Sequence, residues 1–176
     1  MGERAERIPA DWLEDRDVLL IELTDEWLWP SDLRINWFTA FLVADARGVS
    51  DEAIRSLAAS MLAHHCAHVS MWGPDCERVH HGFDDAYLAA APHRVRRWRR
   101  TKWSEEIPFL MTTSLGDERL AQALWFAVYH AWPSGDGYYE DRPASFVALV
   151  EPRFRDEVRG LLLDPERLSR EGEIDC

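Results

Sequence analysis

The feature that most constrains this chain is a regular alternation of short apolar runs with amphipathic stretches from residue 37 onward. Four apolar runs are each followed by a segment whose apolar residues recur with helical spacing, and one further apolar run precedes them. Such alternation is typical of a mostly parallel sheet covered by helices on both faces. The sequence therefore predicts an α/β fold, namely a single three-layer, Rossmann-like (doubly wound) domain over residues 1–176 with about five strands and four helices. The expected strands are residues 17–23, 37–44, 67–72, 108–113 and 144–150.

Capping residues set the expected helix boundaries. Ser50 and Asp75 are favourable N-caps, and each precedes a stretch with a periodic apolar stripe. Ser114 and Asp117 have the spacing of a capping box, and Pro92 is expected to end the second helix. The expected helices are residues 50–65, 75–90, 114–131 and 152–163.

Three segments fall outside this pattern. Residues 1–16 are a polar lead-in. Residues 24–36 are an irregular connection with Trp27 and Trp29 as aromatic anchors. Residues 164–176 are polar and are expected to fray. We expect the first two strands to be adjacent in the sheet and the third to lie centrally.

Composition limits the class of protein. No apolar run approaches the roughly 20 residues that cross a bilayer, and the acidic N-terminus lacks a signal-peptide core. Three cysteines without paired spacing argue against a disulfide framework and favour a reducing, cytoplasmic setting. The net charge of −12 makes this an acidic protein and disfavours nucleic acid as a partner.

A ligand site, if present, is expected outside the carboxyl ends of the parallel strands. The chain has no Rossmann glycine fingerprint and no P-loop there. The acidic residues that open the helices favour helix capping over phosphate binding. The residues predicted to lie nearest a ligand are Asp45, Trp72, Asp75, Cys76, Thr112, Thr113 and Ser114.

The candidate catalytic residues are Cys76, His80 and Asp84. The thiol lies in the first turn of a predicted helix, where the helix dipole lowers a thiol pKa, and the other two follow at intervals of one turn. The alternative is a packed or solvated cysteine, because Asp75 and Glu77 oppose a thiolate. No metal site and no cofactor are predicted, since the histidines match no His-Glu-x-x-His pattern.

A basic segment interrupts the acidic chain. Residues 94–102 carry six basic side chains and no acid, whereas the rest of the chain has a net charge of −18. Three interpretations remain open: an arm held against the chain's own acidic surface, a site for an acidic protein partner, and a nucleic-acid contact with interleaved tryptophans. The candidate partner-binding residues are Arg94, Arg96, Arg97, Trp98, Arg99, Arg100 and Lys102.

Two stretches carry a resemblance to a known family. The sequences WGPDCERVH, from residue 72 to residue 80, and ALWFAVYHAWP, from residue 123 to residue 133, resemble a family of small bacterial α/β domains of unknown function. The resemblance runs from about residue 36 to residue 160. It implies an α/β bacterial domain in which the turn at residues 72–77 is important, and it implies no activity. The basic segment is not part of the family's pattern.

These observations favour a non-enzymatic, cytoplasmic protein-interaction domain. The alternative is a small-molecule or nucleotide-binding domain, or a cysteine-dependent hydrolytic domain, with its site at the carboxyl edge of the sheet. The sequence leaves the oligomeric state open.

Overall fold

The computed structural model describes residues 5–13, 16–33, 35, 37–98, 110–131 and 145–173, and of residues 91–98 it describes the backbone alone. The described strands form one sheet in the order β1-β2-β6-β3-β4-β5. The first strand pairs antiparallel with β2, and every other described pair is parallel. The strands are β1 (Ala5–Ile8), β2 (Asp17–Glu22), β3 (Phe38–Val43), β4 (Cys66–Trp72), β5 (Met111–Ser114) and β6 (Ser145–Val150).

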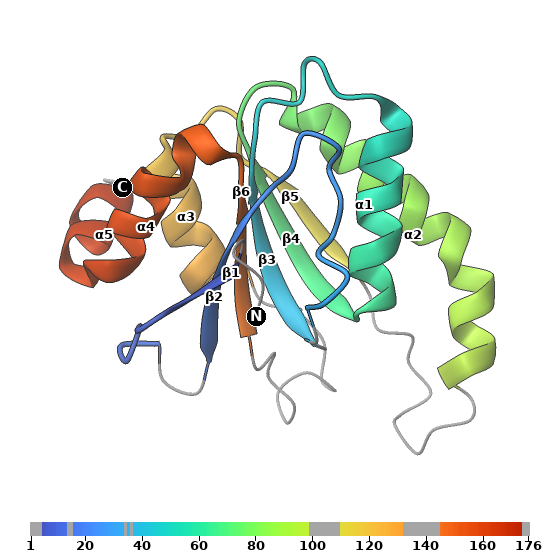
Figure 1. Cartoon of the computed structure of the whole chain (residues 1–176), viewed down its shortest axis with the longest axis horizontal. Coiled ribbons are helices and arrows are strands. Elements are labelled where there is room, and N and C mark those ends of the chain that lie inside the picture. Colours follow the sequence, from blue (N-terminus) through green and yellow to red (C-terminus); the bar gives the residue numbers. More distant parts are fainter. Residues whose placement is uncertain are drawn as a thin grey trace.

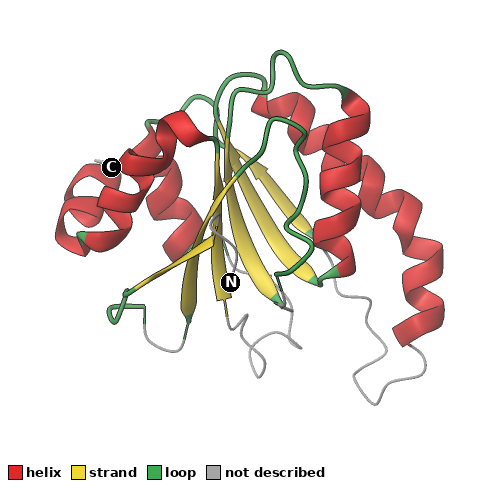
Figure 2. Ribbon diagram, viewed as in Figure 1, coloured by secondary structure: helices red, strands yellow, loops and turns green. Residues whose placement is uncertain are grey.

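Helices cover both faces of this sheet, which confirms the three-layer α/β prediction (Figures 1 and 2). One face carries α1 (Asp51–Ala63) and α2 (Cys76–Trp98), which pack against each other. The other face carries α3 (Leu120–Tyr129), α4 (Arg155–Leu163) and α5 (Pro165–Gly172), and a short 3-10 helix, η2 (Pro152–Phe154), precedes α4. Each helix therefore buries one apolar stripe against the sheet or a neighbouring helix.

The core is divided by the sheet into two apolar layers. Every residue of β3 and β6 is buried, as expected for strands covered on both faces. Phe38 and Phe83 lie in the layer under α1 and α2, and Phe41 and Phe146 lie in the layer under α3 and α4. The irregular connection that follows β2 also joins the first layer through the predicted anchors Trp27 and Trp29, which are 4% and 8% exposed.

The expected strand order is wrong in two places. The first two predicted strands, β2 and β3, are separated by β6, which pairs in parallel with both of them. The third predicted strand, β4, lies next to the last strand of the described sheet and not at its centre. Both errors concern pairing between distant segments, which the local apolar pattern does not encode.

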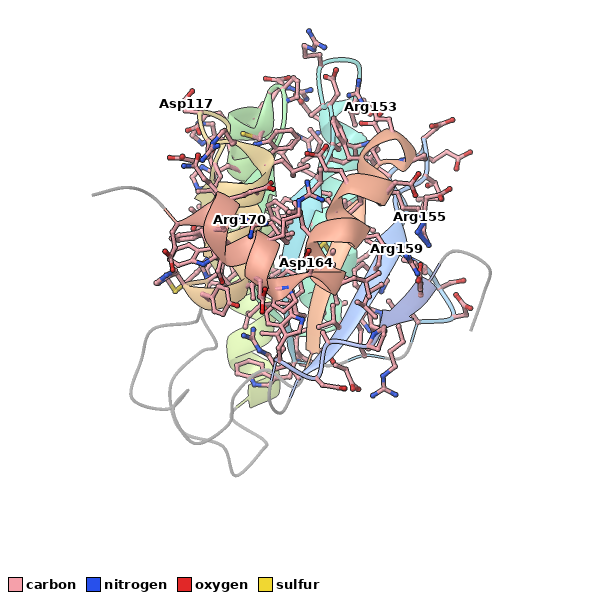
Figure 3. The ribbon with its side chains drawn as sticks, turned by 90° about the vertical axis from the view of Figure 1, so that its left-hand side faces the viewer. Asp117, Arg153, Arg155, Arg159, Asp164 and Arg170 are labelled. Atoms are coloured by element: carbon pink, nitrogen blue, oxygen red, sulfur yellow. The ribbon has the colours of Figure 1, made fainter. Side chains whose placement is uncertain are left out.

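The N-terminal lead-in forms β1, a strand that the sequence analysis missed. Its four residues, Ala-Glu-Arg-Ile, contain a single fully buried side chain, Ile8, so they show no strand-like apolar run. The strand is held by ion pairs as well as by the ladder to β2. Glu6 accepts hydrogen bonds from Arg155 at 2.9 Å and from Arg159 at 2.8 Å, both on α4, on the face shown in Figure 3.

Two helix boundaries predicted near Ser114 and Pro92 are wrong. Ser114 is the last residue of β5, paired with Met71, and the third helix begins six residues later at Leu120. The helix α2 continues through Pro92 to Trp98. Proline removes one backbone donor, and the alanines and arginines on either side of it have high helix propensity, so one missing bond does not end the helix.

Two other predicted helix ends also differ. The first helix, expected to reach residue 65, ends at Ala63, and His65 has a positive φ of 61° and is only partly buried. The expected frayed tail contains α5. Asp164 accepts a hydrogen bond from the Arg167 backbone N–H at 2.9 Å, and Leu168 is fully buried. The sequence does contain a signal for this helix, because the N-cap Asp164 is followed by Pro165 at the first helical position.

Candidate functional site

The carboxyl ends of β3 and β6 form a topological switch point. The chain leaves β3 toward α1 on one face of the sheet and leaves β6 toward η2 and α4 on the other. Ligands of open α/β sheets bind at such a point, because the two diverging connections leave a crevice between them. Of the predicted ligand-binding residues, Asp45 lies here.

Asp45 is bound by the protein's own arginines. Its side chain is 15% exposed, and its carboxylate pairs with Arg47 at 2.5 Å and with Arg153 at 3.1 Å. The hydrogen bond from Arg47 is the main reason why the pKa of Asp45 lies well below its usual value. Glu151, from the end of β6, accepts a hydrogen bond from the Asp45 backbone N–H at 2.8 Å and pairs with Arg153 at 3.0 Å. These four charged side chains therefore neutralise one another across the switch point.

Arg78, which the sequence analysis did not single out, holds the neighbouring part of this edge together. Its guanidinium donates to Asp75 at 2.7 Å and to Asp51 at 2.6 Å, and also to the carbonyl oxygens of Ala46 and Val49. The hydrogen bond to Asp75, followed by the one to Asp51, raises the pKa of Arg78 above its usual value. One side chain thus joins the β3–α1 loop, the start of α1 and the start of α2.

The turn after β4 depends on a glycine. Gly73 has a φ of +121°, and a Cβ atom built there would lie 2.1 Å from the carbonyl oxygen of Ala44. Only glycine allows the two strand-end loops to approach so closely. Asp75, two residues later, has a φ of 65°, and its carboxylate accepts a hydrogen bond from the Arg78 guanidinium.

Trp72 is a packing residue as well as a strand-end residue. Its indole N–H donates to the carbonyl oxygen of Glu118 at 2.8 Å, and its ring meets Phe154 edge-on with 5.4 Å between the centroids. The side chain therefore joins β4 to the loop before α3 and to η2. This contact places Trp72 on the α3 side of the sheet, away from Cys76.

Cys76 and Ser114 are brought together at the start of α2. Their Sγ and Oγ atoms are 3.2 Å apart, and Cys76 is 6% exposed. Gly116 closes over the sulfur, since a Cβ atom built there would lie 2.8 Å from Sγ. The thiol is thus buried with a hydroxyl partner.

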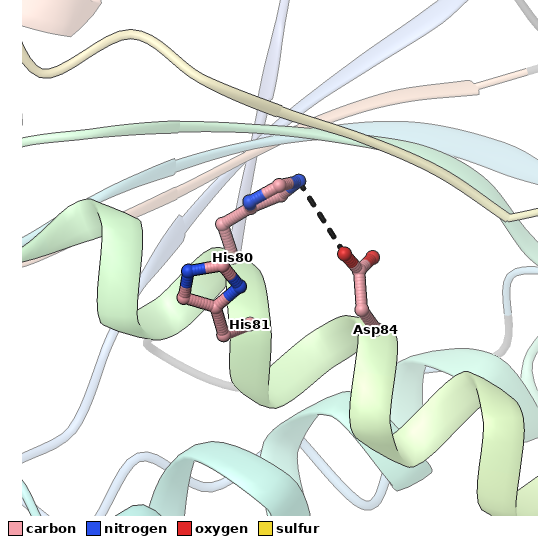
Figure 4. A group of neighbouring side chains, drawn as sticks. All are labelled: His80, His81 and Asp84. Atoms are coloured by element: carbon pink, nitrogen blue, oxygen red, sulfur yellow. Dashed lines mark ion pairs between the residues drawn. The ribbon is translucent and has the colours of Figure 1, made fainter.

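The other two catalytic candidates form a second pair one turn further along α2. His80 Nε2 lies 3.6 Å from Asp84 Oδ2 (Figure 4), and Thr112 donates to Asp84 Oδ1 at 2.7 Å. Thr112 and Ser114 are two residues apart on β5, so both face α2. A polar seam therefore runs between α2 and β5. It is lined by five of the predicted residues: Cys76, His80, Asp84, Thr112 and Ser114.

Thr113 lies on the opposite face of the sheet from this seam. Its hydroxyl is 3.1 Å from Nε2 of His68, a histidine that is 2% exposed. The sheet thus separates Thr113 from its neighbours in sequence. The seven predicted ligand-binding residues do not converge on one point: Asp45 lies at the switch point, four residues lie around the start of α2 and its seam, and Trp72 and Thr113 face α3.

The basic segment begins on α2 and not in a connection. The backbone of residues 94–98, which includes Arg94, Arg96, Arg97 and Trp98, forms the last turns of this helix. Arg99, Arg100 and Lys102 lie outside the described residues, as does the predicted strand before Leu110. The helix starts at the strand-end edge, so these turns lie at its far end (Figure 1).

Comparisons with known proteins give one finding. A family model described as Domain of unknown function (DUF7684) matches residues 19–149. No curated protein and no solved structure matches the chain. None of the helices in the described part of the chain combines the length and apolarity that spanning a bilayer requires.

Proposed function

The chain belongs to the DUF7684 family, a domain of unknown function, and we propose that it is a non-enzymatic, cytoplasmic interaction domain that binds an acidic protein partner. The proposed contact surface is the second half of α2 together with the basic segment, residues 94–102.

The observation that carries this proposal is the length of α2 beyond the body of the protein. Phe83 is the last fully buried residue in the part of α2 whose side chains are described, which ends at residue 90, and Ala86 and Tyr87 pack at the margin of the core. After Phe83 the helix continues for fifteen more residues to Trp98, or about 22 Å. Figure 1 shows this half of α2 extending past the sheet. Leu88 on it is 66% exposed, the largest value for a large apolar side chain among the residues whose burial is described.

Charge indicates the kind of partner. The basic segment has six basic side chains and no acid, and the rest of the chain has a net charge of −18. An acidic protein would be attracted to the segment and repelled by the remaining surface, which would orient the encounter. The same distribution disfavours nucleic acid, because a long phosphate backbone would meet the acidic surface as well.

The strand-end edge supports this interpretation over a ligand pocket. At the switch point Asp45, Glu151, Arg47 and Arg153 bind one another, and Arg78 binds both Asp51 and Asp75. A charged ligand at this edge would have to displace internal ion pairs. The described charges thus serve the fold itself.

The experiment is affinity capture with two charge-matched variants. Each variant replaces four arginines by glutamine. The first variant changes the basic segment at Arg96, Arg97, Arg99 and Arg100. The second changes four exposed arginines elsewhere, namely Arg7, Arg55, Arg119 and Arg170. We expect the first variant to lose the captured acidic protein and the second to retain it, with both folded by circular dichroism. Equal capture by both variants would contradict the proposal. Capture that nuclease treatment abolishes, and that falls steeply with salt, would indicate nucleic acid instead.

The alternative function, a ligand-binding or cysteine-dependent hydrolytic domain, depends on the pair formed by Cys76 and Ser114. A nucleophilic thiol at the start of α2 would be alkylated by iodoacetamide at pH 7 much faster than an ordinary cysteine, and Cys76→Ser would remove that reaction. Slow alkylation is expected, because the thiol is 6% exposed and accompanied by a neutral hydroxyl.

A further inference from the structure

One stripe of α2 carries four side chains of the types that can bind metal ions. Successive residues of an α-helix are rotated by about 100°, so Asp84 lies about 40° around the helix from His80, and His81 about 100°. Glu77 falls between the two histidines in angle, one turn earlier. The stripe therefore presents two imidazoles flanked along the helix axis by two carboxylates.

The atoms of three of these residues are close enough to share one ion. One possible ligand atom each from His80, His81 and Asp84 lies within 4.8 Å of the other two. Ligand atoms about 2.0–2.1 Å from a tetrahedral zinc ion are about 3.4 Å apart. His80 Nε2 and Asp84 Oδ2 are already 3.6 Å apart (Figure 4). His81 is exposed, so its ring can turn toward them without disturbing the core.

A hydroxyl on the sheet holds the carboxylate in place, and a second carboxylate lies near one imidazole. Thr112, on β5, donates to Asp84 Oδ1 at 2.7 Å, which leaves Oδ2 directed at His80. Nδ1 of His80 is buried and has no hydrogen-bond partner among the described residues, while Glu77 Oε1 lies 3.9 Å from it. A small shift of Glu77 would let it accept the Nδ1 proton, and a carboxylate behind a histidine in this way is typical of zinc sites.

We propose that His80, His81 and Asp84 form a binding site for a divalent cation of the zinc class. Two imidazole nitrogens and one carboxylate oxygen favour zinc and late first-row metals over magnesium and calcium, which prefer oxygen ligands. The Asp84 side chain is 46% exposed, so the ion can enter from solvent and keep a coordination position for water. The His-Glu-x-x-His pattern, which the chain lacks, places its two histidines one turn apart, whereas His80 and His81 are adjacent.

The test is calorimetric titration of the chelator-treated full chain with zinc chloride. The unmodified chain should bind one zinc ion at this site. His81→Gln and Asp84→Asn should each weaken binding by at least about tenfold, since losing even an outer-shell group costs about 10- to 100-fold. Asp85→Asn is the matched control: it removes an exposed carboxylate from the next position of the same helix and should leave the affinity unchanged.

Three results would overturn the proposal. The first is the absence of zinc binding, and the second is equal affinity of Asp84→Asn and Asp85→Asn. The third is a thiolate charge-transfer band when cobalt(II) replaces zinc, since it would locate the metal at a cysteine. His81 is exposed, so His81→Gln keeps the test decisive even if a change at half-buried His80 unfolds the protein. Retained partner capture by a variant that no longer binds zinc would separate this site from the proposed function.

Discussion

Single residues at the strand-end edge connect segments that are far apart in sequence. Arg78 is the clearest case, because its guanidinium reaches two carboxylates and two backbone carbonyls contributed by three elements. A lysine could not replace it, since an ammonium group lacks the planar fork that serves several acceptors at once. Asp45 has the matching role at the switch point, with two arginines on its carboxylate and Glu151 on its backbone N–H.

The pH dependence of stability should report the Asp45 contacts. The folded protein holds the pKa of Asp45 below its usual value, chiefly through the hydrogen bond from Arg47. This carboxylate therefore contributes stability that is fully present above the unfolded pKa of about 3.9 and is lost as the pH falls through the lower folded pKa. We expect Asp45→Asn to reduce the free energy of unfolding at pH 7 and the difference from the unmodified chain to shrink below about pH 4.

Urea unfolding of both proteins at several pH values measures this difference. Asp117→Asn removes an exposed carboxylate from another strand-end loop and should leave stability nearly unchanged at every pH. A difference that persists undiminished in acid would show that Asp45 acts through packing and not through its charge.

At the scale of elements, two helices differ from their sequence patterns in opposite ways. The short α5 is strongly polar, yet it docks on α3, with Leu168 fully buried and Gly172 against Trp125. The long α2 has buried apolar residues only up to Phe83 among those whose side chains are described, and its backbone continues as a helix to Trp98. Packing decides the first case and helix propensity the second.

Leu168→Ala tests whether α5 is part of the fold. Truncating a fully buried leucine removes apolar burial and leaves a cavity, so we expect a loss of about 2–5 kcal/mol in the free energy of unfolding. Leu163→Ala is the matched control, because Leu163 is 39% exposed and its truncation should cost less than about 1 kcal/mol. Equal effects would mean that residues 164–173 fray in solution, as their composition suggested.

At the scale of the molecule, the sheet is completed by its last strand. The strand β6 lies between β2 and β3 and pairs with both, so the β1–β2 pair joins the sheet through β6. The loop from β2 to β3 therefore crosses over the position of one strand. That position is filled by β6, which follows β3 by more than 100 residues. Pairing between such distant segments is expected to slow folding.

A fragment of residues 1–144 should therefore fail to fold. Without β6 the described sheet divides into β1–β2 and β3–β4–β5, and both apolar layers lose the side chains of their central strand. We expect no cooperative urea transition and no near-ultraviolet circular dichroism. A fragment of residues 1–163, which lacks α5 alone, should keep a cooperative transition at lower urea concentration. A cooperative transition for the shorter fragment would favour the strand order that the sequence suggested.

The sequence by itself determined the α/β class, the approximate positions of five strands and the helical stripes, because these depend on local periodicity and capping. It also pointed to the turn at residues 72–77 through the family resemblance, and it selected most residues of the seam between α2 and β5. The tertiary structure alone decided the insertion of β6, the docking of α5, the separation of Thr113 from Ser114 across the sheet and the contacts of Arg78. These depend on which distant segments pair, and no short window of residues contains that information.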